Sequence, residues 1–196
     1  MSLAWCPMAT SVRERILEAT YVCVARYGMG KTTVEDAARQ ARMSRATLYR
    51  YFPGGKDQLL AETVGWEATR FFQRLAAAVA ATPDFATMLE EALIFAHRAI
   101  EQHEVLQKVL QTEPERLLPL LTVESDRILA FIQSFLEPLV ARERLAEGLT
   151  APRAAQHLAR MLLSYTAAQG RWDLADRAQV AQIVRQELLA GILRQP

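Results

Sequence analysis

Residues 32–60, which read TTVEDAARQARMSRATLYRYFPGGKDQLL, decide the fold of this chain. Small apolar side chains recur there at the i, i+3, i+4, i+7 spacing of one helical face: Val34, Ala37, Ala38 and Ala41. Thr32 or Thr33 can begin this helix as N-cap, and Glu35 or Asp36, three residues later, can complete a capping box. The pattern therefore predicts a helix with a well-marked start and a face suited to close packing.

A second short helix is predicted to begin after Ser44, which can serve as its N-cap. Leu48 and Phe52 form an apolar i, i+4 pair on this helix. Pro53 and the two glycines that follow it end the helix. Two short helices joined by a tight turn are the result.

The other faces of the second helix carry side chains that few cores accommodate: Arg45, Ala46, Thr47, Tyr49, Arg50 and Tyr51. Arginine can fork to a guanine edge, an alanine or threonine methyl can meet a thymine methyl, and hydroxyls and cations can reach phosphates. This set is typical of a recognition helix in the major groove of DNA. Periodicity alone fits an ordinary solvated helical hairpin equally well.

Residues 12–62 resemble the DNA-binding domain of the tetracycline-repressor (TetR) family of transcriptional regulators. Many positions carry the resemblance in order and spacing: Ile16, Leu17, Ala19, Tyr27, Gly28, Thr32, Thr33, Val34, Ala38, Ala41, Ser44, Thr47, Leu48, Tyr49, Tyr51, Phe52, Lys56, Asp57, Leu59 and Leu60. The resemblance implies a helix-turn-helix domain over residues 10–56 that contacts double-stranded operator DNA. The residues expected to contact DNA are Thr33, Arg42, Ser44, Arg45, Ala46, Thr47, Tyr49, Arg50, Tyr51 and Lys56.

Two features depart from the family pattern. Arg42 stands where the turn usually carries a glycine, so it would have to take a left-handed or otherwise strained backbone conformation. It also places another cation near the DNA. The Pro-Gly-Gly segment before Lys56 is one residue longer than the common form, which affects the placement of that lysine on a phosphate.

Composition and charge agree with a folded, two-part chain. Its 196 residues are 51% hydrophobic, which is ample for a packed core, and the net charge is only +1. Residues 1–60 hold nine Lys and Arg against five Asp and Glu, whereas the remaining residues hold fourteen against seventeen. The basic character therefore lies where DNA contacts are expected. Cys6 and Cys23 form no CxxC pair, and Cys23 is expected in the core.

The coarse pattern predicts an all-α fold, because no useful stretch alternates as a half-buried strand does. The expected helices cover residues 11–27, 32–42, 44–52, 56–81, 84–103, 104–112, a short piece between Pro114 and Pro119, 123–147, 151–169 and 176–192. Residues 1–9 are expected to be a disordered tail. A long fourth helix would join the DNA-binding domain to a larger helical domain for effector binding and dimerisation, residues 57–196. No signal peptide or membrane span is evident, so a cytoplasmic location without membrane contact is expected.

The last two helices carry much apolar surface, which predicts association with a second chain. The residues expected in the dimer interface are Leu158, Met161, Leu162, Tyr165, Val184, Leu188 and Ile192. The resemblance implies a two-fold homodimer built on four such helices. Such a dimer presents two recognition helices to successive turns of the groove, about 34–36 Å apart, and so predicts a palindromic operator.

Aromatic and polar residues between the fourth helix and the dimer helices suggest a small-molecule site. The residues expected to contact the effector are Trp66, Phe72, Phe95, His103, Phe131, Phe135 and Tyr165. Plain core packing is the alternative for each aromatic side chain. His97 and His103 are six residues apart and point to different helical faces, so a shared metal is not expected. No cofactor is predicted.

The leading hypothesis is a sequence-specific transcriptional regulator, a dimeric repressor that a small, mainly apolar effector releases from its operator. Activation, or a requirement for the ligand as corepressor, would use the same parts with the opposite sign. The alternative is a ligand-independent helical protein that organises DNA or scaffolds a partner.

An enzyme is not expected, because the sequence lacks a nucleophile–base spacing, paired carboxylates and an HExxH motif. Residues 28–33, GMGKTT, resemble the end of a phosphate-binding P-loop. Ala25 occupies the place of that motif's first glycine, so a loop leading into a capped helix is the preferred interpretation. Thr33 at that helix start remains a plausible phosphate contact.

Overall fold

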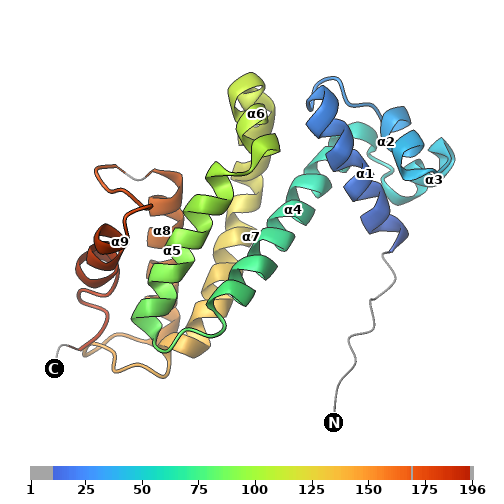
Figure 1. Ribbon diagram of the computed structural model, residues 1–196. Coiled ribbons are helices and arrows are strands. Elements are labelled where there is room, and N and C mark those ends of the chain that lie inside the picture. Colours follow the sequence, from blue (N-terminus) through green and yellow to red (C-terminus); the bar gives the residue numbers. More distant parts are fainter. Residues whose placement is uncertain (1–10, 169, 195–196) are drawn as a thin grey trace, which may run out of the picture. The chain divides into compact units, whose positions relative to one another are not determined.

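The structure, a computed structural model, describes residues 11–168 and 170–194, with backbone only for residues 123–125. The predicted tail, residues 1–9, lies outside the described residues. The described ranges form helices and no strand, apart from an isolated β-bridge between Leu145 and Leu193. This confirms the all-α prediction. The helices are α1 (Val12–Tyr27), α2 (Val34–Ala41), α3 (Arg45–Tyr51), α4 (Gly55–Val79), α5 (Phe85–Glu101), α6 (Glu104–Thr112), α7 (Pro114–Val140), α8 (Ala151–Ala167) and α9 (Arg177–Ile183), with a π-helical turn η1 (Val184–Leu188) (Figure 1).

The chain forms two compact units. The N-terminal unit contains residues 1–69 together with 108–120, and the C-terminal unit contains residues 70–107 and 121–196. This division differs from the predicted boundary after residue 56, because α4 and α7 each contribute residues to both units. Residues 108–120, far away in the sequence, join the N-terminal unit through side-chain contacts with α1 and with the loop that follows it.

Apolar side chains from the first four helices form the core of the N-terminal unit: Ile16, Leu17, Ala19, Val34, Ala37, Ala38, Ala41, Leu48, Phe52 and Leu59. Side-chain caps define the helix starts. Ser11 and Glu14 form a capping box on α1, and Thr33 and Asp36 form another on α2. Ser44 accepts a hydrogen bond from the backbone N–H of Thr47 at the start of α3. The predicted packing face and caps of this unit are therefore present.

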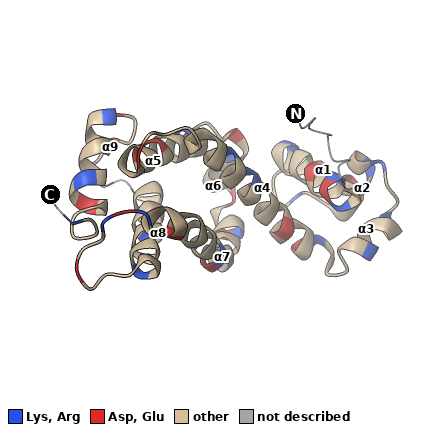
Figure 2. Ribbon diagram, turned by 90° about the horizontal axis from the view of Figure 1, so that it is seen from below, with Lys and Arg blue, Asp and Glu red and all other residues tan. Residues whose placement is uncertain are grey.

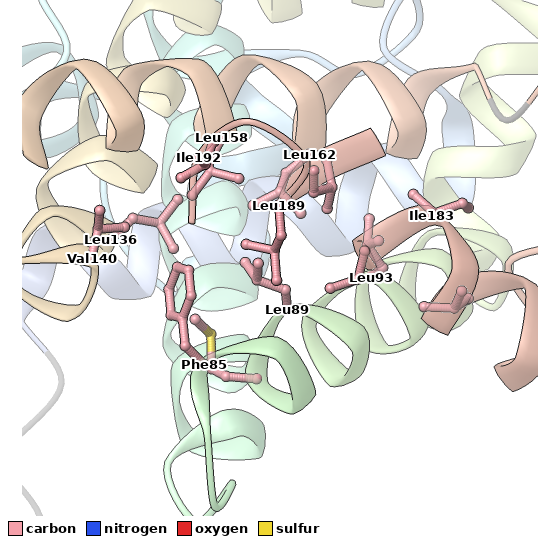
Figure 3. Packing of buried hydrophobic residues seen from close by; sticks show 14 of the residues in the cluster. Phe85, Leu89, Leu93, Leu136, Val140, Leu158, Leu162, Ile183, Leu189 and Ile192 are labelled. Carbon is pink, nitrogen blue, oxygen red and sulfur yellow. The ribbon is translucent and has the colours of Figure 1, made fainter. Parts of the chain in front are cut away.

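The core of the C-terminal unit lies between α5, α7, α8 and the α9–η1 segment. Figure 3 shows Leu89 and Leu93 of α5 directed toward Leu158 and Leu162 of α8, with Leu189 among them. Phe85 closes one end of this cluster near Leu136 and Val140 of α7. A backbone hydrogen bond from Ala146 N–H to the Ile192 carbonyl oxygen, 2.9 Å long, ties the loop after α7 to the end of the chain.

Three predicted helices differ in the structure. The separate pieces expected at 114–119 and 123–147 are one helix, α7, which ends at Val140. Pro119 lies in the second turn of α7, where it costs one backbone hydrogen bond without ending the helix. The last predicted helix, 176–192, stops being α-helical after Ile183 and continues as η1. Prediction from proline positions and apolar periodicity alone therefore gave the wrong ends for these helices.

Candidate nucleic-acid interface

The turn between α2 and α3 is built around Arg42. This residue caps α2 with φ 56° and ψ 45°, in the left-handed region, as predicted for a residue in the place of the usual glycine. The N–H of Met43 donates to the Ala38 carbonyl oxygen at 2.9 Å and so closes the turn. The Arg42 side chain is exposed. The turn therefore sets the direction of α3 while leaving a cation at the surface.

The inward side of α3 is fixed by two large apolar residues. Leu48 is 1% exposed and Phe52 is 2% exposed, both in the core of the N-terminal unit. The remaining predicted DNA contacts of this segment face outward or sideways: Ser44, Arg45, Ala46, Tyr49 and Arg50 are exposed, and Thr47 and Tyr51 are half-buried. Figure 2 marks the basic residues of α3 in blue. Helix α3 is therefore held on one side by Leu48 and Phe52, and its other side, which is polar and cationic, faces solvent.

Arg45 has two neighbours within the same unit. Its Nε lies 2.9 Å from Glu35 Oε1, and its guanidinium carbon lies 5.5 Å from the centre of the Tyr49 ring. A hydrogen bond with the Tyr49 side chain, followed by the charge of Glu35, raises the pKa of Arg45. The guanidinium is therefore charged and held over α3, with most of its surface exposed.

A cation missed by the sequence reasoning, Arg13 of α1, supports the end of α3. It forms an ion pair with Glu62 of α4, donates to the Tyr51 carbonyl oxygen at 3.4 Å and lies over the Phe52 ring. These contacts connect α1, α3 and α4 beside the predicted DNA contact Tyr51. A single arginine on an otherwise polar helical face carries no periodic signal that would have identified it.

Two predicted phosphate contacts make hydrogen bonds within the chain. The Thr33 hydroxyl accepts from the Asp36 N–H at 3.1 Å, and its side-chain bond to Asp36 is the main cause of the lowered pKa of that carboxyl group. Lys56 is half-buried, and its Nζ donates to the Gly30 carbonyl oxygen at 2.6 Å. Lys56 therefore has an anchoring role here that the sequence did not indicate.

The C-terminal unit contains a small apolar cavity of about 40 Å³, which is partly open to solvent. Its lining comes from α4, α5, α7 and α8: Phe72, Leu75, Ala76, Val79, Met88, Leu89, Ala92, Phe131, Ile132, Phe135, Leu136 and Leu162. The Phe72 and Phe131 rings are 4.9 Å apart, and Phe131 is 45% exposed. None of the described residues that line the cavity is polar.

Three of the predicted effector contacts line this cavity: Phe72, Phe131 and Phe135. The other four lie elsewhere. Trp66 packs on the core of the N-terminal unit, Phe95 contacts Phe71, and His103 Nδ1 accepts from the Leu106 N–H at the start of α6. Tyr165 packs against the C-terminal core. The aliphatic lining residues were missed because their spacing is that of ordinary core.

Five of the predicted dimer contacts are buried in the core of their own unit: Leu158, Leu162, Val184, Leu188 and Ile192. Met161 and Tyr165 are half-buried. The apolar face of α8 packs against α5 and η1 of the same chain. The prediction that these five side chains are left for a partner therefore needs correction, because periodicity identifies an apolar face without identifying what covers it.

Among the described residues no group of three or more His, Cys, Asp or Glu side chains could hold a metal ion. No helix in the described part of the chain is long and apolar enough to cross a membrane.

Comparison with known families identifies the N-terminal segment. Residues 16–63, which include α2, α3 and most of α1, match the family described as "Bacterial regulatory proteins, tetR family". Over 54 residues the chain is 33% identical to an uncharacterised HTH-type transcriptional regulator of Mycobacterium tuberculosis, found in two strains. This match covers 28% of the chain and 28% of the relative.

Solved structures extend the likeness in fold to nearly the whole chain. The TetR family repressor AlkX from Dietzia is 20% identical, with a TM-score of 0.65 over 97% of this chain and 98% of that protein. The Rhodococcus erythropolis transcriptional repressor QsdR is 19% identical, with a TM-score of 0.62 over 94% and 97%. At these identities the similarity establishes a shared fold and nothing finer.

Proposed function

We propose that the chain is a sequence-specific DNA-binding repressor of the TetR family, whose description residues 16–63 match, and that a small, mainly apolar effector releases it from its operator. The family and the fold are those of regulators rather than enzymes. The observation that carries the proposal is the outward face of α3. It presents Arg45, Ala46, Tyr49 and Arg50 to solvent while Leu48 and Phe52 hold the helix from behind.

The proposed division of labour follows from the chemistry of each group. Arg45 would fork to a base edge, for which it must leave the exposed Glu35 carboxylate. Arg42, Arg50 and the hydroxyl groups of Ser44 and Tyr49 would bind phosphates and set the register of the helix. Thr33 would offer its phosphate contact from the start of α2, where free backbone N–H groups favour an anion.

Selection of bound duplexes from a random pool, at stated salt, tests the proposal with wild type and Arg45→Ala. We expect a palindrome from the wild type and relaxed preference at one position of each half-site from the variant. The variant should bind the selected site about 5–150-fold more weakly, the equivalent of roughly 1–3 kcal/mol. Equal losses on selected and random DNA would contradict base contact by Arg45.

A two-fold dimer is part of the proposal, because a palindrome requires two recognition helices related by symmetry. The outward face of α8 is polar in this chain, with Gln156, His157 and Arg160 exposed beside the half-buried Met161. We propose this face, rather than the buried leucines, as the partner surface on α8. Sedimentation equilibrium with Arg160→Glu tests it: the wild type should sediment as a dimer, and the variant should shift toward monomer.

The cavity in the C-terminal unit supports the effector part of the proposal. The cavity is small, but its lining offers an apolar group dispersion contacts without hydrogen-bond partners. Burying a hydroxyl or charge there would leave that group unsatisfied, at a cost of several kcal/mol. The effector, or the part of it that enters the cavity, should therefore be a hydrocarbon group. Any polar group would remain at the open side near Phe131.

A further inference from the structure

We infer that Glu113, a residue distant from α3 in the sequence, is a positioning residue for DNA binding because its carboxylate holds the loop that leads into α2. Glu113 immediately precedes α7 and belongs with residues 108–120 to the N-terminal unit. Its Oε2 accepts from the Gly30 N–H at 2.6 Å, and its side chain is 18% exposed. The inference rests on the proposed DNA-binding function.

The loop of residues 28–33 is shaped around this carboxylate. Gly30 does not have a positive φ, so its backbone would tolerate any residue. A Cβ at Gly30 would nevertheless lie 2.8 Å from Glu113 Oε2 and 3.2 Å from Arg116 Nε, so the Glu113 carboxylate would have to move away. At Gly28, with φ 83°, a Cβ would collide with Glu113 Oε1. In the sequence these glycines resemble a phosphate-binding loop. In the structure the anion beside them is the carboxylate of Glu113, from the same chain.

Both polar groups of Gly30 are engaged. Its N–H donates to Glu113, and its carbonyl oxygen accepts from Lys56 Nζ, so the residue is held between the α6–α7 junction and the start of α4. Lys108 adds a nearby contact, because its Nζ donates to the Ala25 carbonyl oxygen at 2.8 Å. The Thr32 hydroxyl is buried and donates to the Gly28 carbonyl oxygen at 2.7 Å. The loop therefore enters α2 with its path fixed.

A fixed loop matters for DNA binding because Thr33, the N-cap of α2, is the third residue after Gly30. A loop that moves must be ordered when phosphate binds at that helix start, and the ordering cost lowers affinity. Glu113 itself need not touch DNA. Its removal should therefore weaken binding to every sequence without changing which bases are preferred.

Variants at Glu113 test this with a matched control. We expect Glu113→Ala to weaken operator binding about three- to tenfold, the scale of one typical hydrogen bond, with the selected palindrome unchanged. Glu113→Gln should restore most of the affinity, since its amide oxygen can still accept from Gly30. Glu115→Ala is the control: Arg116 Nε lies 3.4 Å from Glu113 and 4.0 Å from this exposed neighbour, but it is Glu113 that accepts the hydrogen bond from the loop. Equal effects of Glu113→Ala and Glu115→Ala would overturn the inference.

A double-mutant cycle with Gly30→Ala separates positioning from general destabilisation. The added methyl group should displace the flexible Glu113 carboxylate without straining the backbone, so Gly30→Ala should lower affinity as Glu113→Ala does. The double variant should be no worse than either single variant, and fully additive losses would contradict a shared contact. Amide hydrogen exchange at Gly30 should accelerate in Glu113→Ala even without DNA. If the wild type binds no duplex, the proposed function fails, while unchanged exchange at Gly30 refutes the contact independently.

Discussion

Arg42 combines a left-handed backbone conformation with an exposed charge, and the two can be separated by mutation. Its φ of 56° lies in the region that costs non-glycine residues about 1–2 kcal/mol. Arg42→Gly should therefore raise the free energy of unfolding by about 1 kcal/mol, measured by denaturant titration. If Arg42 binds phosphate, the same variant should bind DNA more weakly and lower the salt slope by about one unit.

Arg42→Ala is the control for this pair of effects. It removes the charge but keeps a Cβ at the left-handed position, so it should lose DNA affinity as Arg42→Gly does without gaining stability. A glycine variant less stable than the alanine variant would show that the left-handed residue is not strained. An unchanged salt slope in both would remove Arg42 from the phosphate contacts.

Helix starts in this chain depend on ionised carboxylates. Hydrogen bonds in the first turn lower the pKa of Glu14 at α1, Asp36 at α2, Asp84 at α5 and Asp176 at α9, where the Gln179 side chain is the main cause. For Asp84 the main cause is the backbone N–H of Thr87, which donates to Oδ1 at 2.8 Å. A carboxyl group whose pKa is lower in the folded than in the unfolded state stabilises the fold only while it is ionised.

The pH dependence of stability follows from this sign. The stabilising contribution should be complete well above the unfolded Asp pKa of about 3.9 and should be lost as the pH falls through the lower folded values. Asp84→Asn keeps an N-cap acceptor but cannot titrate. We therefore expect similar stability at pH 7 and a smaller loss between pH 5 and pH 3 than in the wild type, measured by urea unfolding. Parallel losses in both proteins would exclude Asp84 from the acid response.

Local signals predicted the structure of the α2–α3 segment well. The capping box at Thr33, the left-handed Arg42 and the outward face of α3 all depend on residues a few positions apart. Contacts between distant residues were not predictable in this way. Glu113 meets Gly30 across 83 positions, and one carboxylate in a polar segment carries no periodic signal.

Apolar periodicity in the C-terminal unit gave the correct helical faces but not their partners. The spacing of Leu158, Val184 and Leu188 is the same whether the face packs on its own chain or on a second one, and the structure places all three in the chain's own core. The cavity was anticipated from aromatic residues, three of which line it. Its aliphatic residues, such as Val79 and Leu136, have the same spacing as core residues without a cavity nearby.

The apolar lining of the cavity predicts which small molecules raise the melting temperature. Hexane, which fills apolar space without needing a hydrogen bond, should raise the melting temperature by several degrees when near saturation, as expected for a ligand that binds only the folded state. Hexanediol, of the same chain length, should not, because the lining offers its hydroxyl groups no partner. Ala92→Phe should fill the cavity and abolish the hexane effect, whereas Ala78→Phe, at an exposed position of α4 outside the lining, should retain it.

Measurements of operator affinity then show whether a ligand in the cavity controls DNA binding. If a hydrocarbon releases the protein from DNA, hexane must lower operator affinity by the same factor by which operator DNA lowers hexane affinity. Both factors can be measured by titration with the duplexes recovered by selection. A melting-temperature shift without any change in operator affinity would mean that the cavity binds apolar groups but does not control DNA binding, because a ligand with equal affinity for both states shifts neither.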